Sequence, residues 1–191
     1  CIYRFLAGGN VESEYHEAEV VLSSALEKVR SAGFSHDVLR ILWLRGIVQA
    51  NQGRLSEALC TLREGMRLAE LNGERYWFSR FPNTVGWLYG ELADFDSALR
   101  LNTEGVRAGR ESDFLEPEAN SHINLANAYL ELGDTSLAWE HLSEGERILE
   151  REHHVGWLRW RFKIRLDLEM ARYWIARGDT VQGQARAEDA L

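Results

Sequence analysis

Leu-Ala-Asn-Ala-Tyr-Leu-Glu-Leu-Gly-Asp-Thr-Ser-Leu-Ala, residues 125–138, is the stretch that decides the fold, because its skeleton recurs along the chain. It places a Gly-Asp pair five residues before a small residue, Ala138. The same frame appears forty residues earlier, eighty residues earlier and forty-five residues later, as Ala93-Asp94 with Ala98, Gly53-Arg54 with Ala58, and Gly178-Asp179 with Gly183. A repeat of this length indicates stacked supersecondary units that bury their apolar faces against each other.

Between these turns, apolar residues recur every three or four positions, which predicts amphipathic helices. A stripe before the first turn consists of Tyr15, Ala18, Val21, Leu22, Ala25, Leu26 and Val29. Helices are predicted over about 36–52, 54–72, 74–92, 94–112, 117–132 and 134–152. Asp94 is a suitable N-cap, and Pro117 suits a first helical turn. Residues 2–7, followed by Gly8-Gly9-Asn10, are predicted to be the tail of a further helix.

Two segments do not fit the simple pattern. Pro82 falls inside a predicted helix, so we expect either a kink near Arg80 or a helix that begins later than the repeat suggests. From Leu158 to Glu169, apolar and polar residues alternate, which taken alone is typical of a strand. The repeat frame requires a helix just downstream, so we predict a helix there as well.

The sequence therefore predicts an all-α fold, a right-handed α-solenoid of stacked antiparallel helix pairs. One solenoid of about five hairpins is expected over residues 1–191, divided into 1–33 (partial), 34–73, 74–113, 114–153 and 154–191 (partial). The chain starts at Cys1 and stops at Leu191 within an apolar helical pattern, without polar capping repeats. We interpret it as a fragment of a longer protein.

The repeats resemble tetratricopeptide repeats. The best match comprises Leu125, Ala126, Tyr129, Gly133, Ala138, Leu142 and Gly145, and weaker copies contain Val85, Gly86, Tyr89, Ala98 and Gly105, and Arg45, Gly46, Ala58, Leu62 and Gly65. The period of forty and the lack of a closing proline depart from that family's shorter norm and imply longer helices. Long repeats of this kind resemble the sensor regions of large bacterial signal-transduction ATPases and transcriptional regulators.

Composition excludes several classes of function. The chain has 22 basic and 30 acidic residues, a net charge of -8, which disfavours nucleic-acid binding. Two cysteines are too few for a disulfide framework, and no long apolar run or signal peptide is present, so we expect a soluble, cytoplasmic protein without membrane contact. Phosphate-loop, zinc-protease and nucleophile-elbow motifs are absent from the sequence. We predict no enzymatic activity, no cofactor and no metal site.

Local clusters also have ordinary explanations. His153 and His154 are neighbours whose side chains would diverge on a helix, so we expect solvated histidines rather than a metal site. Cys60 is expected to be a small packing residue. The Glu-rich segments 12–27 and 140–152 suit a solvated face or, alternatively, a dock for a basic partner. The basic and aromatic segment 159–163 is attributed to packing, with nucleic-acid stacking as the alternative.

The resemblance implies a concave groove lined by the first helix of each repeat. The family's groove positions correspond to Arg40, Trp43 and Ile47, then Arg80, Asn83 and Trp87, then Asn120, Ile123, Asn124 and Asn127, then Arg165, Leu168 and Arg172. Asparagine can pair with a peptide backbone, and arginine can hold a carboxylate with two hydrogen bonds. We therefore expect an electropositive groove for an acidic peptide or a C-terminal carboxylate. The alternative is that these residues merely pair with Glu74, Glu91, Glu131 or Glu169.

The sequence thus predicts a protein-binding or peptide-binding scaffold, as the interaction or sensor region of a larger regulatory protein. The alternative function is a small-molecule sensor or a self-assembly module, in which the groove takes a small ligand or the open ends of the solenoid stack on another copy through Ala187, Ala190 and Leu191.

Overall fold

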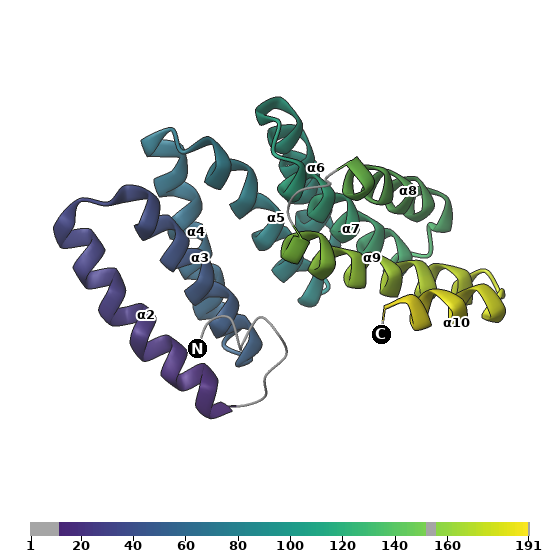
Figure 1. Ribbon diagram of the computed structural model, residues 1–191, viewed down its shortest axis with the longest axis horizontal. Coiled ribbons are helices and arrows are strands. Elements are labelled where there is room, and N and C mark those ends of the chain that lie inside the picture. The colour runs from purple at the N-terminus through teal and green to yellow at the C-terminus, as the bar shows by residue number, and fades with distance from the viewer. Residues whose placement is uncertain (1–11, 152–155, 191) are drawn as a thin grey trace. The chain divides into compact units, whose positions relative to one another are not determined.

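The fold is known from a computed structural model, which describes residues 12–151 and 156–190, with side chains over 15–151 and 162–190. Every described element is an α-helix (Figure 1). In chain order they are α2 (Glu12–Ala32), α3 (Ser35–Asn51), α4 (Leu55–Asn72), α5 (Arg75–Glu91), α6 (Phe95–Ser112), α7 (Leu115–Glu131), α8 (Thr135–Arg151), α9 (Gly156–Ala176) and α10 (Thr180–Asp189). The predicted all-α fold of antiparallel helix pairs is confirmed.

Contacts divide the chain into two compact units, Cys1–Phe81 and Pro82–Leu191. In the first unit, α2 packs on α3 and α3 packs on α4. In the second, α6 to α10 form a continuous succession of neighbouring contacts, and α7 also touches α9. The boundary lies inside α5, whose last ten residues belong to the second unit.

Outside residues 152–155, turns between helices fall about every twenty residues, and each contains a residue with left-handed backbone conformation. Positive φ angles occur at Gly33, Gly53, Gly73, Ala93, Asp113, Gly133 and Gly178. Glycine adopts this conformation without steric cost, whereas Ala93 and Asp113 hold it at φ 57° and 58° against the preference of an L-residue. The predicted period of forty is therefore two helices and two such turns.

Aspartates begin three of the helices. The side chains of Asp94, Asp134 and Asp179 each accept a hydrogen bond from a backbone N–H three residues on, at 3.2, 3.0 and 3.0 Å. Each bond satisfies one of the amides that a helix start leaves unpaired. The N-cap predicted at Asp94 is confirmed, and Pro117 lies in the first turn of α7 as expected.

Small residues allow neighbouring helices to touch within each unit. A Cβ placed on Gly65 would lie 2.2 Å from Phe81 Cζ, and one on Gly105 would lie 2.4 Å from Ser121 Oγ. Both distances are far below van der Waals contact, so a larger residue there would force the helices apart. The packing role expected for the repeated glycines is confirmed at these positions, whereas Gly145 has ordinary space around it.

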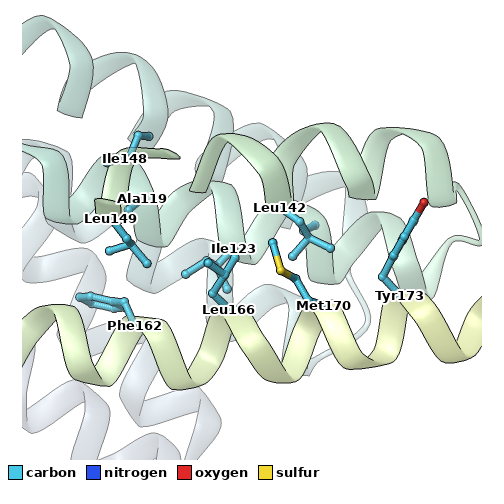
Figure 2. Close-up of a cluster of buried hydrophobic side chains, with 10 residues drawn as sticks. Ala119, Ile123, Leu142, Ile148, Leu149, Phe162, Leu166, Met170 and Tyr173 are labelled. Carbon is cyan, nitrogen blue, oxygen red and sulfur yellow. The ribbon is translucent and has the colours of Figure 1, made fainter. Parts of the chain in front are cut away.

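The apolar core of the second unit lies between α7, α8 and α9. Figure 2 shows Phe162, Leu166 and Met170 along one face of α9, opposite side chains of α7 and α8. Each of these three is at most 1% exposed. The packing interpretation of the segment 159–163 is thus confirmed at Phe162. The side chains of residues 159–161 lie outside the described part of the chain. The helix predicted for residues 158–169 is also confirmed, because burial against a repeat neighbour overrides the alternating pattern.

Several local predictions need correction. Helix α5 begins at Arg75 and continues through Pro82, so the delayed start is wrong; proline costs the helix one hydrogen bond, and packing on both sides of it sustains the rest. Cys60 is exposed rather than packed, because it lies one position beyond the buried stripe of α4. Val21, predicted to lie on the apolar stripe of its helix, is 53% exposed, whereas its neighbour Leu22 is buried. Residues 2–10 lie outside the described part of the chain.

Candidate functional site

A shallow groove runs along the first helices of the repeats in the second unit. It consists of two adjoining pockets of about 170 and 460 Å³ that share Gly90, Glu91 and Asn127. Five predicted groove residues line it, namely Trp87, Asn124, Asn127, Arg165 and Arg172. These five residues thus line one surface hollow, formed by α5, α7 and α9 with a contribution from α6.

The charge of this groove differs from the expectation. Alongside Arg165 and Arg172, its lining includes Glu91, Glu131 and Glu169, so the two pockets are not electropositive. These glutamates lie on the same first helices and face the same side. Arg172 pairs with both Glu131 and, at 2.8 Å, Glu169. The alternative of pairing with nearby glutamates therefore applies to Arg172, and the electropositive interpretation is wrong for this groove.

The groove's smaller polar contacts follow the same pattern. Asn127 Nδ2 donates to a Glu169 oxygen at 3.1 Å, and Trp87 Nε1 donates to Glu91 at 3.0 Å. Both residues are only partly buried. Exposed pairs of this kind contribute little to stability and exchange readily with other partners. Trp87, Asn127 and Arg172 are thus predicted groove residues whose side chains remain accessible to a ligand.

A buried amide network occupies the positions where we expected peptide-binding asparagines. Asn120 Nδ2 donates to Asn83 Oδ1 at 2.9 Å, and Asn124 Nδ2 donates to the Asn83 carbonyl and to Asn102 Oδ1, both at 2.9 Å. Arg165 donates to Asn120 Oδ1 and, at 2.8 Å, to Asn124 Oδ1. The four asparagines are at most 6% exposed. Their side chains therefore join α5, α6, α7 and α9, and the sequence did not reveal this role.

The predicted residues of the first unit are not among those that line this groove. Arg40 is exposed and pairs with Asp37, three residues earlier, at 2.9 Å. Trp43 is buried, and the Arg80 guanidinium lies 4.4 Å from its ring centroid, a cation–π contact. Arg80 is 2% exposed. These two residues form a packed pair, because the indole ring covers the guanidinium.

A larger pocket, of about 700 Å³, lies elsewhere in the second unit and shares no lining residue with the groove. It is lined by residues of α6, α7 and α8: Val106, Arg110, His122, Ser136, Trp139, Glu140, His141, Ser143, Glu144 and Arg147. Volumes of this size are typical of ligand sites. The pocket is lined by two histidines, two arginines and two glutamates, a denser set of ionisable groups than the groove holds.

Two histidines in this pocket contact each other. His122 Nδ1 lies 2.9 Å from His141 Nδ1, and the imidazole of His141 is stacked on Tyr129 at a centroid distance of 5.5 Å. Burial, and then the neighbouring His141, lower the pKa of His122 to about 4. Burial also lowers the pKa of His141. Both imidazoles are therefore neutral at neutral pH, which is the form that ligates metal ions.

Carboxylates complete the cluster. Glu118, His122 and Glu144 each place one ligand atom within 4.8 Å of those of the other two, and they are the metal-competent group among the described residues. Arg110 donates to Glu118 at 2.9 Å and lies 3.6 Å from Glu144, which also pairs with Arg147 at 2.5 Å. The hydrogen bond from Arg147 holds the pKa of Glu144 below its usual value.

Sequence analysis missed this cluster, although its spacing was visible. Glu118 and His122 are four residues apart and His141 and Glu144 three apart, so each pair shares a helix face. His122 and Glu144 are also equally distant from the turn at Gly133, which places them opposite each other in an antiparallel hairpin. The histidine pair that stands out in the sequence, His153 and His154, lies outside the described residues.

Comparisons with known proteins support the fold. No protein-family model matches the chain, and no curated protein sequence matches it. Among solved structures, the crystal structure of BtubC (BKLC) from P. vanneervenii is similar, with a TM-score of 0.73 over 94% of this chain and 72% of that one. The two sequences are 17% identical, so the likeness concerns the helical-repeat fold alone.

Over the described ranges, no helix is both long enough and apolar enough to cross a bilayer.

Proposed function

We propose that this chain is a helical-repeat scaffold that binds an extended peptide segment of a protein partner in the groove of α5, α7 and α9. The observation that carries the proposal is a continuous hollow along the first helices of successive repeats, lined by accessible polar and aromatic side chains. Repeat proteins use such extended surfaces to bind other proteins.

The groove's composition supports a peptide ligand. Gly90 lines both pockets, and a Cβ there would have no neighbour within 4 Å, so a peptide backbone has room to approach. Asn127 offers an amide of the kind that pairs with peptide groups, and Trp87 offers an apolar surface. Arg172 would take an acidic side chain or a terminal carboxylate of the peptide in exchange for its surface ion pairs.

The acidic residues refine the partner that we propose. Glu91 and Glu131 line the 460 Å³ pocket of the groove together with Arg172, so a ligand of purely acidic character would meet repulsion there. A segment carrying both a carboxylate for Arg172 and a basic group for Glu91 or Glu131 fits better. The period of forty resembles the repeats of large regulators, and we place this scaffold in such a protein.

A peptide array tests this function. Immobilised peptides that vary in net charge and in the presence of a free C-terminal carboxylate are probed with the wild-type chain and with Arg172→Glu, Asn127→Ala and Arg107→Glu. Arg107 is the matched control, because it is an exposed arginine that pairs with Glu111 on α6 and does not line the groove. We expect mixed-charge peptides to bind and the two groove variants to lose that binding. Equal binding by all four proteins, or binding of no peptide, would contradict the proposal.

A further inference from the structure

The pocket of α6, α7 and α8 contains a polar atom that the fold leaves without a partner. His122 is 5% exposed, and its Nε2 atom is buried without a hydrogen-bond partner. A buried nitrogen without a hydrogen-bond partner is destabilising, so its presence calls for an explanation. Its ring is nevertheless held firmly, since Nδ1 is engaged with His141.

We propose that Glu118, His122 and Glu144 bind one divalent transition-metal ion of the zinc type, and that His141 positions the His122 ring for it. This site is independent of the peptide groove, since the two share no lining residue. Imidazole nitrogen together with carboxylate oxygen is a ligand set that zinc and its neighbours accept.

The contact between the histidines fixes which nitrogen faces the ion. A hydrogen bond between the two Nδ1 atoms needs a proton on one of them. A metal at His122 Nε2 requires that proton on His122 Nδ1, which then donates to His141 Nδ1. Metal-ligating histidines characteristically donate their second N–H to a neighbouring acceptor, which sets the tautomer and the ring orientation. His141 is therefore a positioning residue.

The three ligand atoms are close enough to converge. They lie within 4.8 Å of one another, whereas donors around a tetrahedral zinc ion with bonds of ~2.0–2.1 Å stand roughly 3.4 Å apart. Each donor must therefore move by no more than about 1 Å, which rotation of the two carboxylate groups provides. Glu118 and His122 share one face of α7, and Glu144 approaches from the antiparallel α8, so the helix pair supplies the frame.

Two arginines compete with the ion for the carboxylates. Arg110 pairs with Glu118 and Glu144, and Arg147 pairs with Glu144. Their side chains are 61% and 52% exposed, so both can swing into solvent at low cost when an ion arrives. The pocket above the cluster, which includes His122 and Glu144 in its lining, gives the ion a path and leaves room for water as a fourth ligand.

The test is direct metal binding to the untagged full chain freed of metal by chelation. Zinc is titrated by calorimetry, and cobalt is titrated with its visible ligand-field absorption as the report of coordination. We expect one ion per chain, loss of that binding in His122→Gln and Glu118→Gln, and a Kd weakened about 10- to 100-fold in His141→Ala. Arg110→Gln should bind the ion more tightly, because a competitor is removed, and a merely structural role for these residues does not predict that gain.

Controls separate the site from chance binding and from misfolding. His16→Gln removes an exposed histidine of α2, and Glu140→Gln removes an acidic neighbour outside the ligand set; both should bind like the wild type. Glu144→Gln, at a partly exposed position, serves if a buried variant fails to fold by circular dichroism. The proposal is overturned if the wild type binds no stoichiometric ion. It is also overturned if folded His122→Gln or Glu144→Gln binds the ion as tightly as the wild type, which is the result expected for a site at His153 and His154.

Discussion

Replacing Asn124 with alanine should be among the most damaging single changes in the second unit. Its side chain donates to the Asn83 carbonyl and to Asn102, and accepts from Arg165. A net hydrogen bond contributes about 1 kcal/mol, and one to a charged group about 1.5–3 kcal/mol. With its partners left buried, Asn124→Ala is expected to lower the free energy of unfolding by about 3–5 kcal/mol.

Asn127→Ala is the matched comparison. Asn127 lies about one turn further along the same helix, and its side chain donates a hydrogen bond to Glu169, which is only partly buried. That variant should lose less than about 1 kcal/mol. Urea unfolding followed by circular dichroism measures both, and Arg165→Met added to Asn124→Ala should reveal a coupling of about 0.5–3 kcal/mol. If Asn124→Ala cost no more than Asn127→Ala, the network would not hold the helices and our assignment of these asparagines to structure would be refuted.

Three further predictions concern stability. Gly65→Ala should destabilise the first unit by about 1–3 kcal/mol, since its Cβ would collide with Phe81. Gly90→Ala, whose Cβ would meet open space in a helix, should increase stability by up to about 1 kcal/mol. Thermal melts compare the two variants. Asp134→Ala should cost about 1 kcal/mol in urea unfolding by removing a helix cap, and Asp134→Asn should retain most of that stability. With chelator present, His122 should make stability fall as the pH drops from its ordinary pKa of 6.5 to about 4, because only the unfolded chain binds that proton in this range; the loss reaches about 3 kcal/mol, and His122→Gln should flatten the curve.

The helices and turns were largely predictable because their causes are local. The left-handed turn at Gly133 and the caps at Asp94 and Asp134 depend on residues within a few positions, and the apolar spacing sets each buried face. Exposure at the groove positions was not predictable in the same way. Asn124 is buried because Arg165, forty-one residues later, closes over it. A repeat frame marks equivalent positions but does not say which of them the next repeat covers.

The metal-competent cluster illustrates a different limit. Its spacing, Glu118 with His122 and His141 with Glu144, was present in the sequence, but such pairs are common on helices. What distinguishes this one is the burial of the His122 ring and the contact between the two imidazoles, which only the packed hairpin supplies. Motif spacing alone predicted no metal site, because it contains neither the burial of His122 nor the contact between the two imidazoles.

The buried amide network also bears on how a chain of repeated helix pairs packs each pair against its proper neighbour. At Asn102 the neighbouring repeats carry Leu62 and Leu142, and at Asn83 they carry Trp43 and Ile123. A helix pair that docked one repeat away from its proper neighbour would bury amides against apolar side chains and forfeit their hydrogen bonds. We expect this network to destabilise packing arrangements in which a helix pair is shifted by one forty-residue repeat. The same penalty disfavours exchange of repeats between molecules.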